Sequence, residues 1–111
     1  MKRAERQPLG NTHLFGGVFI KEMLIPDSGT LVPTHRHSYG HISYVAAGAV
    51  RVWRDDVLLG EFVAPAAVRI EARAAHKILS LVDCTLVLCV HAIGEAEGVS
   101  IEEEHHLQFE D

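Results

Sequence analysis

Three closely spaced histidines carry the strongest chemical signal in this sequence. His35, His37 and His41 stand within seven residues, and Gly48 follows after six more. Neutral imidazole is the commonest metal ligand in proteins and donates its lone pair without a charged partner. Because side chains two residues apart in a strand face the same side, His35 and His37 would lie about 6–7 Å apart at Cα. Both rings could then bind one ion about 2 Å from each nitrogen. The alternative is a loop with surface histidines, but three at this spacing favour a metal site.

The same alternation of side chains indicates further candidate ligands. His41 shares the parity of His35 and His37, so it can face the same side if the chain turns at residues 38–40. A fourth ligand must come from elsewhere, and His76, which opens an apolar stretch, is the candidate. Taken alone, His76 could equally be a half-buried structural histidine. The other histidines are weaker candidates: His91, which fits a core or edge strand position, His13, which has no partner nearby, and His105 and His106 in the tail.

The histidine run resembles the first sequence motif of the cupin family. That motif is a glycine, five residues, His-x-His, three or four residues, a glutamate, six residues and a glycine. The chain fits this frame without a gap, and the positions that match it are Gly29, His35, His37, position 41 and Gly48. The one departure is that histidine replaces glutamate at position 41.

The second cupin motif is matched much less well. It reads Gly-Asp, followed by Pro-x-Gly-x-x-His, and His76 is taken as its final residue. Counting back from His76, the positions of the other motif residues hold Pro65, Ala66, Glu71 and Arg73. Of this motif the histidine alone is present. The first motif is specific and the second is merely compatible.

The resemblance covers roughly residues 15–93 and implies an all-β, single-domain β-barrel of the jelly-roll type. It also implies one divalent metal (manganese, iron, nickel, copper or zinc) inside the wide end of the barrel. Carried over residue by residue, the ligands would be His35, His37, His41 and His76. Small cupins commonly dimerise through an N-terminal strand, which implies a homodimer in which residues 1–12 take part.

Replacing the glutamate of the motif by His41 has a chemical consequence. Four neutral imidazoles leave a divalent ion with its full charge, so such a site favours the M(II) state and is more Lewis-acidic toward a bound oxygen. An octahedral ion would keep two open positions for a hydroxy-keto or enediol oxygen pair. Imidazole ligands suit Zn, Cu, Fe and Ni better than Mg or Ca.

The rest of the sequence predicts short strands separated by turn residues, a pattern typical of β-sandwiches and barrels. Two hairpins are expected, one around Asp55-Asp56 and one around Val82-Asp83-Cys84. We expect residues 1–12 to form an N-terminal arm or edge strand, residues 13–93 the barrel, and residues 94–111 an acidic segment that is either a short helix or a frayed strand. The predicted strands are 18–25, 31–36, 42–47, 50–54, 57–63, 67–70, 78–81 and 85–92.

Composition limits the function classes. A net charge of −5 without a basic patch argues against nucleic-acid binding, and no apolar run approaches the roughly 20 residues of a membrane span. No apolar segment follows the basic residues at the start, so we expect a cytoplasmic protein. Cys84 and Cys89, five residues apart on an expected strand, would be about 16 Å apart and therefore free thiols. A thiolate ligand role for one of them is the alternative.

Two functions remain open at this stage. The first is a metal-dependent enzyme, either an oxygenase or a Lewis-acid lyase or isomerase, acting on a small oxygenated molecule. No evident general acid or base stands beside the ligands, and the nearest candidates are Glu22 and Glu71. The second is a non-catalytic module that binds a small ligand and holds a structural metal. A barrel with vestigial histidines and no metal is a third reading.

Overall fold

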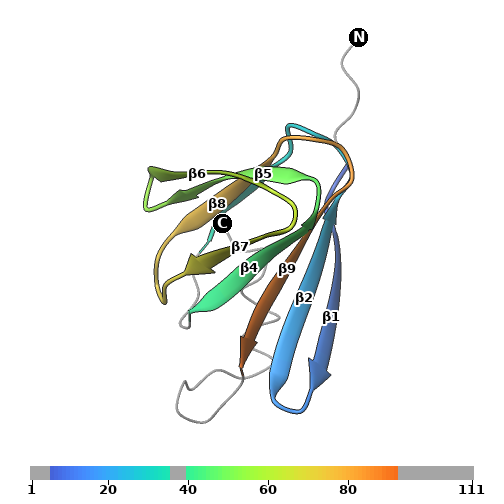
Figure 1. Ribbon diagram of the computed structural model, residues 1–111, viewed down its shortest axis with the longest axis vertical. Helices are drawn as coiled ribbons and strands as arrows, with labels where there is room; N and C mark the ends of the chain where they lie inside the picture. Colours follow the sequence, from blue (N-terminus) through green and yellow to red (C-terminus); the bar gives the residue numbers. More distant parts are fainter. Residues whose placement is uncertain (1–5, 36–39, 93–111) are drawn as a thin grey trace.

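The computed structural model describes residues 6–35 and 40–92, with the backbone alone described at 33–35. These ranges contain nine β-strands (Figure 1). The strands are β1 (Leu9–Phe15), β2 (Val18–Ile25), β3 (Leu31–His35), β4 (His41–Ala47), β5 (Ala49–Arg54), β6 (Val57–Val63), β7 (Ala66–Ile70), β8 (His76–Ser80) and β9 (Thr85–Ala92).

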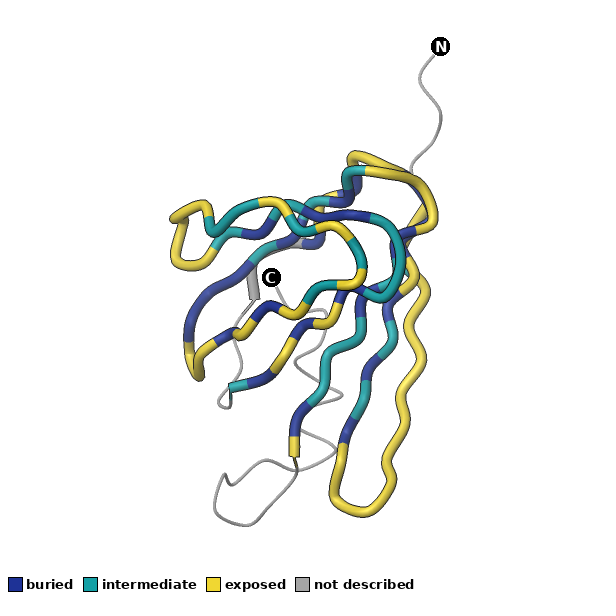
Figure 2. The backbone as a smooth tube through the Cα atoms, viewed as in Figure 1, coloured by how far each residue is buried: buried dark blue, intermediate teal, exposed yellow. Residues whose placement is uncertain are grey.

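The strands form two antiparallel sheets that enclose the core. One sheet has the order β1-β2-β9-β4-β7 and the other the order β3-β8-β5-β6. Buried and exposed residues alternate along β2, β4 and β7, as expected for strands with one face toward the core (Figure 2). Within the described ranges there is no helix. The predicted all-β jelly-roll architecture is confirmed.

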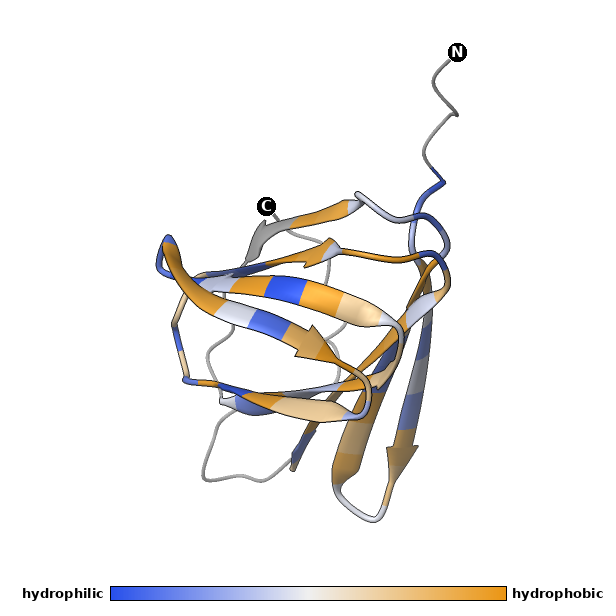
Figure 3. Cartoon of the chain, turned by 45° about the horizontal axis from the view of Figure 1, so that its top comes forward, coloured by the Kyte–Doolittle hydropathy of each residue, from blue (hydrophilic) through white to orange (hydrophobic). Residues whose placement is uncertain are grey.

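Apolar side chains from both sheets fill the space between them. The five-stranded sheet contributes residues such as Ile25, Val45 and Val87, each with less than 1% of its surface exposed. Val50 and Ile78 pack against them from the four-stranded sheet. Hydrophilic positions alternate with apolar stretches along the strands (Figure 3). This core fixes the two sheets against each other and so fixes what lies at the barrel ends.

Local turn chemistry confirms the first predicted hairpin. β5 and β6 pair across the loop Asp55-Asp56. Both aspartates have positive φ, 49° and 65°, as a two-residue loop of this twist requires, and aspartate tolerates that conformation better than most residues. The Asp55 carboxylate also accepts a hydrogen bond of 2.9 Å from the Ala75 N–H, which attaches the loop to the residue just before β8.

The second predicted hairpin is wrong. β8 pairs with β3 and β5, whereas β9 pairs with β2 and β4 in the other sheet. The segment around Val82-Asp83-Cys84 therefore crosses between the sheets. Cys84 belongs to this turn and not to a strand, with a φ of 56° and its N–H donating to the Pro26 carbonyl. Cys84 and Cys89 are free thiols, as predicted.

The N-terminal part of the described chain forms the edge of the larger sheet. β1 pairs with β2 along its whole length through a Gly16-Gly17 loop, whose φ values of 57° and 80° suit a tight hairpin. The expected boundary between residues 12 and 13 falls inside β1, and the expected segment 94–111 lies outside the described residues. Every residue of β1 is exposed, so its free edge could pair with another chain. The homodimer stays a prediction.

A buried hydrogen-bond network closes the end of the barrel opposite the histidines. The Asp27 carbonyl accepts hydrogen bonds from the Ser80 hydroxyl (2.7 Å) and the Thr30 hydroxyl (2.8 Å). The Thr30 N–H donates in turn to Ser80 Oγ at 3.0 Å. Ser80 is 1% exposed, so its hydroxyl ties the turn before β3 to the end of β8 without competition from water.

Replacing Ser80 by alanine is expected to destabilise the fold by about 1–3 kcal/mol, because the Thr30 N–H would lose its acceptor inside the protein. Urea denaturation followed by far-ultraviolet circular dichroism measures the effect. Ser28→Ala removes the same atom at an exposed position of the same turn and should change stability by less than about 0.5 kcal/mol. Equal effects of the two substitutions would contradict the prediction.

No helix in the described ranges has the length and apolar composition needed to cross a membrane.

Candidate metal centre

Two of the four predicted ligands face each other inside the barrel. His41 is the first residue of β4 in the five-stranded sheet, and His76 is the first residue of β8 in the four-stranded sheet. Their ring centroids are 5.1 Å apart and the ring planes are inclined by 55°. His41 is 5% exposed and His76 is 1% exposed, and all four ring nitrogens are buried. The fold thus joins two imidazoles that are far apart in sequence.

This separation suits two ligands of one ion. An ion about 2.1 Å from one nitrogen of each ring lies about 3.3 Å from each ring centre, by the usual metal–imidazole bond length. Angles at the metal of about 90–109°, as in square-planar or tetrahedral coordination, then place the ring centres about 4.7–5.4 Å apart. The observed 5.1 Å lies within this interval. The donor type is also suitable, because imidazole nitrogens bind divalent transition metals well.

The other two predicted ligands are placed less fully. His35 ends β3, and its Cα is paired directly with that of His76 across an irregularity in the β3–β8 register. The side chain of His35 and the whole of His37 lie outside the described residues. Among the side chains that the structure does describe, no group of three His, Cys, Asp or Glu residues could hold a metal. The four-histidine site remains a prediction, with two of its members in contact.

His91 lies beside this pair without being in the predicted ligand set. It belongs to the inner face of β9, is 6% exposed, and packs against Phe19 with ring centroids 5.4 Å apart. Its Nδ1 is 3.1 Å from the Ala92 carbonyl oxygen. These contacts are those of a core histidine at the end of a strand, the role that the sequence favoured.

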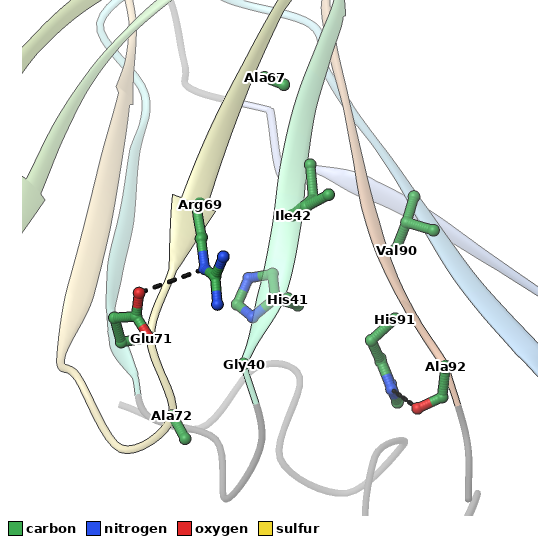
Figure 4. Close-up of a pocket in the computed structure, with 10 residues that line it drawn as sticks. All are labelled: Gly40, His41, Ile42, Ala67, Arg69, Glu71, Ala72, Val90, His91 and Ala92. Atoms are coloured by element: carbon green, nitrogen blue, oxygen red, sulfur yellow. Dashed lines mark hydrogen bonds and ion pairs between the residues drawn. The ribbon is translucent and has the colours of Figure 1, made fainter.

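An open pocket of about 530 Å³ borders the histidines (Figure 4). It lies mainly over the outer face of the sheet, because outward-facing residues of β4, β7 and β9, such as Ile42, Arg69 and Val90, line it, while the buried His41 and His91 border it from the inner side. At its rim Arg69 and Glu71 form an exposed ion pair of 3.2 Å. The volume is sufficient for a small metabolite next to His41.

The acid–base candidates from the sequence differ in their distance from this pocket. Glu22 lies on the outer face of β2, where its carboxylate is 2.9 Å from His13 Nε2. Glu71 is one of the pocket residues, but its side chain is 58% exposed. Of the two, Glu71 alone is positioned near a molecule bound beside His41.

The sequence also offers Tyr39, Tyr44, Arg51 and Trp53 as residues that could line a pocket, because half of each barrel strand faces inward. Those that the structure describes take other roles. Tyr44 is 37% exposed on the outer side of β4, and Arg51 pairs with Glu61 on an exposed surface at 2.6 Å. Trp53 lies under the ammonium group of Lys77, which is 5.2 Å from the ring centroid. Tyr39 lies outside the described residues.

The sequence reading missed a second polar group in the interior. Lys21 is 5% exposed on the inner face of β2, in register with Cys89 of β9. Cys89 Sγ lies 3.8 Å from Ser43 Oγ. Burial raises the pKa of the Cys89 thiol, while the hydrogen bond with Ser43 and the positive charge of Lys21 act in the opposite direction. The signal was available, because Lys21 shares the parity of the apolar residues that face the core in β2.

Comparison with solved structures identifies the fold of this chain. No protein-family model matches the sequence, and no curated protein matches it significantly. Solved structures do match: KdgF from Halomonas sp. has a TM-score of 0.71 at 16% identity, over 88% of this chain and 89% of that one. The chain has the cupin fold. A cupin superfamily protein from Desulfitobacterium hafniense DCB-2 has a TM-score of 0.69 at 18% identity, with 85% and 84% covered.

A third cupin structure agrees with this result. An RmlC-like cupin family protein with a double-stranded β-helix fold from Methanocaldococcus jannaschii has a TM-score of 0.67 at 16% identity, with 84% of this chain and 86% of that one covered. At these identities the likeness is one of fold, so the cupin architecture expected from the histidine motif is confirmed. Metal binding and activity have to be argued from this chain's own residues.

Proposed function

We propose that this cupin binds one divalent transition metal at the histidine-lined end of its barrel and is a metal-dependent enzyme acting on a small oxygenated molecule. The observation that carries the proposal is the buried His41–His76 pair, which joins the two sheets with a ring separation of 5.1 Å. Two buried imidazoles at a distance that one ion can bridge support a site inside the barrel and not a surface cluster.

His35 and His37 would complete the ligand set. The backbone of His35 is directly opposite His76, which is the position that a neighbouring ligand requires. A divalent ion bound by neutral imidazoles supplies Lewis acidity to an oxygen ligand. The chain itself contributes the buried position of His41 and His76, which keeps bulk water from the ring nitrogens.

The alternative is a non-catalytic cupin that binds a small ligand, with the metal as a structural or docking element. One observation favours it. The two glutamates considered as acid–base groups are exposed, one on the outer face and one at the pocket rim. An enzyme that moves protons needs a group within hydrogen-bond reach of its substrate, and Glu71 would have to turn inward to serve.

Elemental analysis of protein purified without an affinity column tests the proposal. We expect about one equivalent of manganese, iron, nickel, copper or zinc per chain. Protein reconstituted anaerobically with each metal is then assayed for oxygen uptake and for conversion of diols, diketones and hydroxyketones. Turnover supports the enzyme, and metal binding without turnover for any of the five supports the alternative. Protein that binds none of these metals excludes both.

A further inference from the structure

The outer face of the five-stranded sheet is largely apolar. β9, the middle strand, directs only apolar side chains outward. Its neighbours β2 and β4 add large exposed side chains, which are Val18 (41% exposed), Leu24 (36%), Ile42 (47%) and Tyr44 (37%). Contiguous exposed apolar patches of more than a few hundred Å² mark interaction sites. We therefore looked for features of this face that fit a particular partner.

The tip of the β1–β2 hairpin projects an aromatic ring from one side of this face. Phe15 is paired with Val18, so both side chains are on the outer face. Phe15 is 88% exposed, more than any other large hydrophobic residue that the structure describes. Val18 is in turn paired with Ala92, so the tip is level with the end of β9 (Figure 1).

The pocket of about 530 Å³ lies at the same level on the other side of the face. It extends from β9 across β4 to β7, and its outward lining includes Ile42, Ala67 and Val90. Four strand spacings, about 19 Å, separate β1 from β7, so Phe15 cannot fill the pocket of its own chain. A rotation of 180° about an axis parallel to the strands keeps the level and exchanges the two sides. It places the tip of one copy over the pocket of another.

We propose that the outer face of the five-stranded sheet is the contact surface of a twofold-symmetric dimer, in which Phe15 of each copy enters the pocket of the other. Such an interface is self-complementary, because each copy supplies one projection and one recess. Two sheets with aligned strands pack face to face in the same way inside β-sandwiches. This dimer differs from one that pairs the free edges of β1, which would leave the outer face uncovered.

Area and charge both suit a second copy. Five strands about 4.8 Å apart and about seven residues long cover about 570 Å². Two copies would thus bury somewhat more than the roughly 1,000 Å² that a specific interface needs. In the five strands, all of which the structure describes, the outward-facing carboxylate is Glu22 of β2 and the outward-facing Lys or Arg is Arg69 of β7. The rotation brings these opposite charges of the two copies to the same side.

Sedimentation velocity of the full chain over a range of concentrations tests the proposal. We expect the wild-type protein to sediment as a dimer. Ile42→Glu introduces a charge at the centre of the face and should raise the dissociation constant of the dimer by at least about 100-fold. Phe15→Ser should raise it by at least about 10-fold. Leu31→Glu is the matched control, since Leu31 is 48% exposed but belongs to the four-stranded sheet, and it should change the constant by less than about 2-fold.

A cross-link tests the position of Phe15 in the dimer. Cys84→Ser first removes the exposed native thiol. In this background, Phe15→Cys combined with Ala67→Cys should give a covalent dimer with a short bismaleimide, because the two positions face each other across the interface. Phe15→Cys combined with Leu31→Cys should give none.

Three results would overturn the proposal. A wild-type protein that stays monomeric would leave residues 93–111 of the same chain, or another protein, to cover the face. A dimer that withstands Ile42→Glu would favour pairing of the β1 edges, and a dimer that Ile42→Glu and Leu31→Glu weaken equally would locate no interface on this face. The substituted side chains are exposed, so the variants should fold, which circular dichroism checks. If Ile42→Glu does not fold, the wild-type protein, Phe15→Ser and the cross-link still decide.

Discussion

Replacing His76 by alanine is expected to lower metal affinity by at least about 100-fold, more than the loss of an outer-shell partner usually costs. His76 is 1% exposed and its ring lies 5.1 Å from that of His41, so its removal takes away a donor that solvent cannot easily replace. The measurement is competition for zinc or cobalt against a chromophoric chelator. The truncation also leaves a cavity between the sheets, which should destabilise the metal-free protein by about 2–4 kcal/mol.

His91→Ala distinguishes the effect of losing a metal ligand from the effect of losing a buried side chain. His91 is 6% exposed at the same end of the barrel, but its ring packs against Phe19 and it is not a predicted ligand. The His91→Ala protein should be destabilised by the same kind of cavity and should keep its metal. A second variant, His76→Leu, fills most of the cavity and should bind metal no better than His76→Ala. If His76→Ala retained the metal and His91→Ala lost it, the proposed ligand set would be wrong.

The parts of the fold that were predictable depend on local chemistry. The strand at 18–25 is found unchanged as β2, because its apolar residues keep one parity and a turn cluster follows it. The β5–β6 hairpin was predictable because Asp55 and Asp56 accept positive φ. Both features are determined within a few residues, and so the sequence shows them directly.

The errors concern pairing between distant segments. Nothing in the alternation of β8 and β9 indicates that they join different sheets, since both have one apolar face and a short turn between them. The sequence does not decide between an arm and an edge strand for the N-terminal residues, because β1, at the edge of the sheet, buries no apolar face and has no alternation to read. Sheet membership is decided by long-range packing.

The candidate site also combines features set by local sequence with features set by long-range packing. His35 and His37 could be paired by parity alone, but the meeting of His41 and His76 depends on the two sheets closing over one core. That meeting was expected from the resemblance to cupins and not from spacing. The burial of Lys21 was not predicted although its parity is readable, because the sequence does not show which side chains lie beside it across the sheet.

Gly48 provides the second large effect, because it links β4 of one sheet to β5 of the other. Its φ is +84°, and a Cβ built there would lie 2.8 Å from the Cα of Thr85 and also collide with the Thr85 side chain. Thr85 has less than 1% of its surface exposed, and its hydroxyl donates to the Val82 carbonyl at 2.9 Å, so it cannot move aside. Gly48→Ala should therefore cost about 1–3 kcal/mol in backbone strain and about 1–3 kcal/mol more in overpacking.

Gly29→Ala is the matched control for this second prediction. Gly29 has a similar φ of +77°, but nothing lies within 4 Å of a Cβ at that position. It should show the backbone strain alone, so the difference in unfolding free energy between the two variants measures the contact with Thr85. Urea denaturation gives both values, and a Gly48→Ala protein that cannot be obtained folded while Gly29→Ala folds agrees with the prediction. Equal losses would mean that backbone conformation, and not the close approach of the two sheets at Thr85, is what requires glycine at position 48.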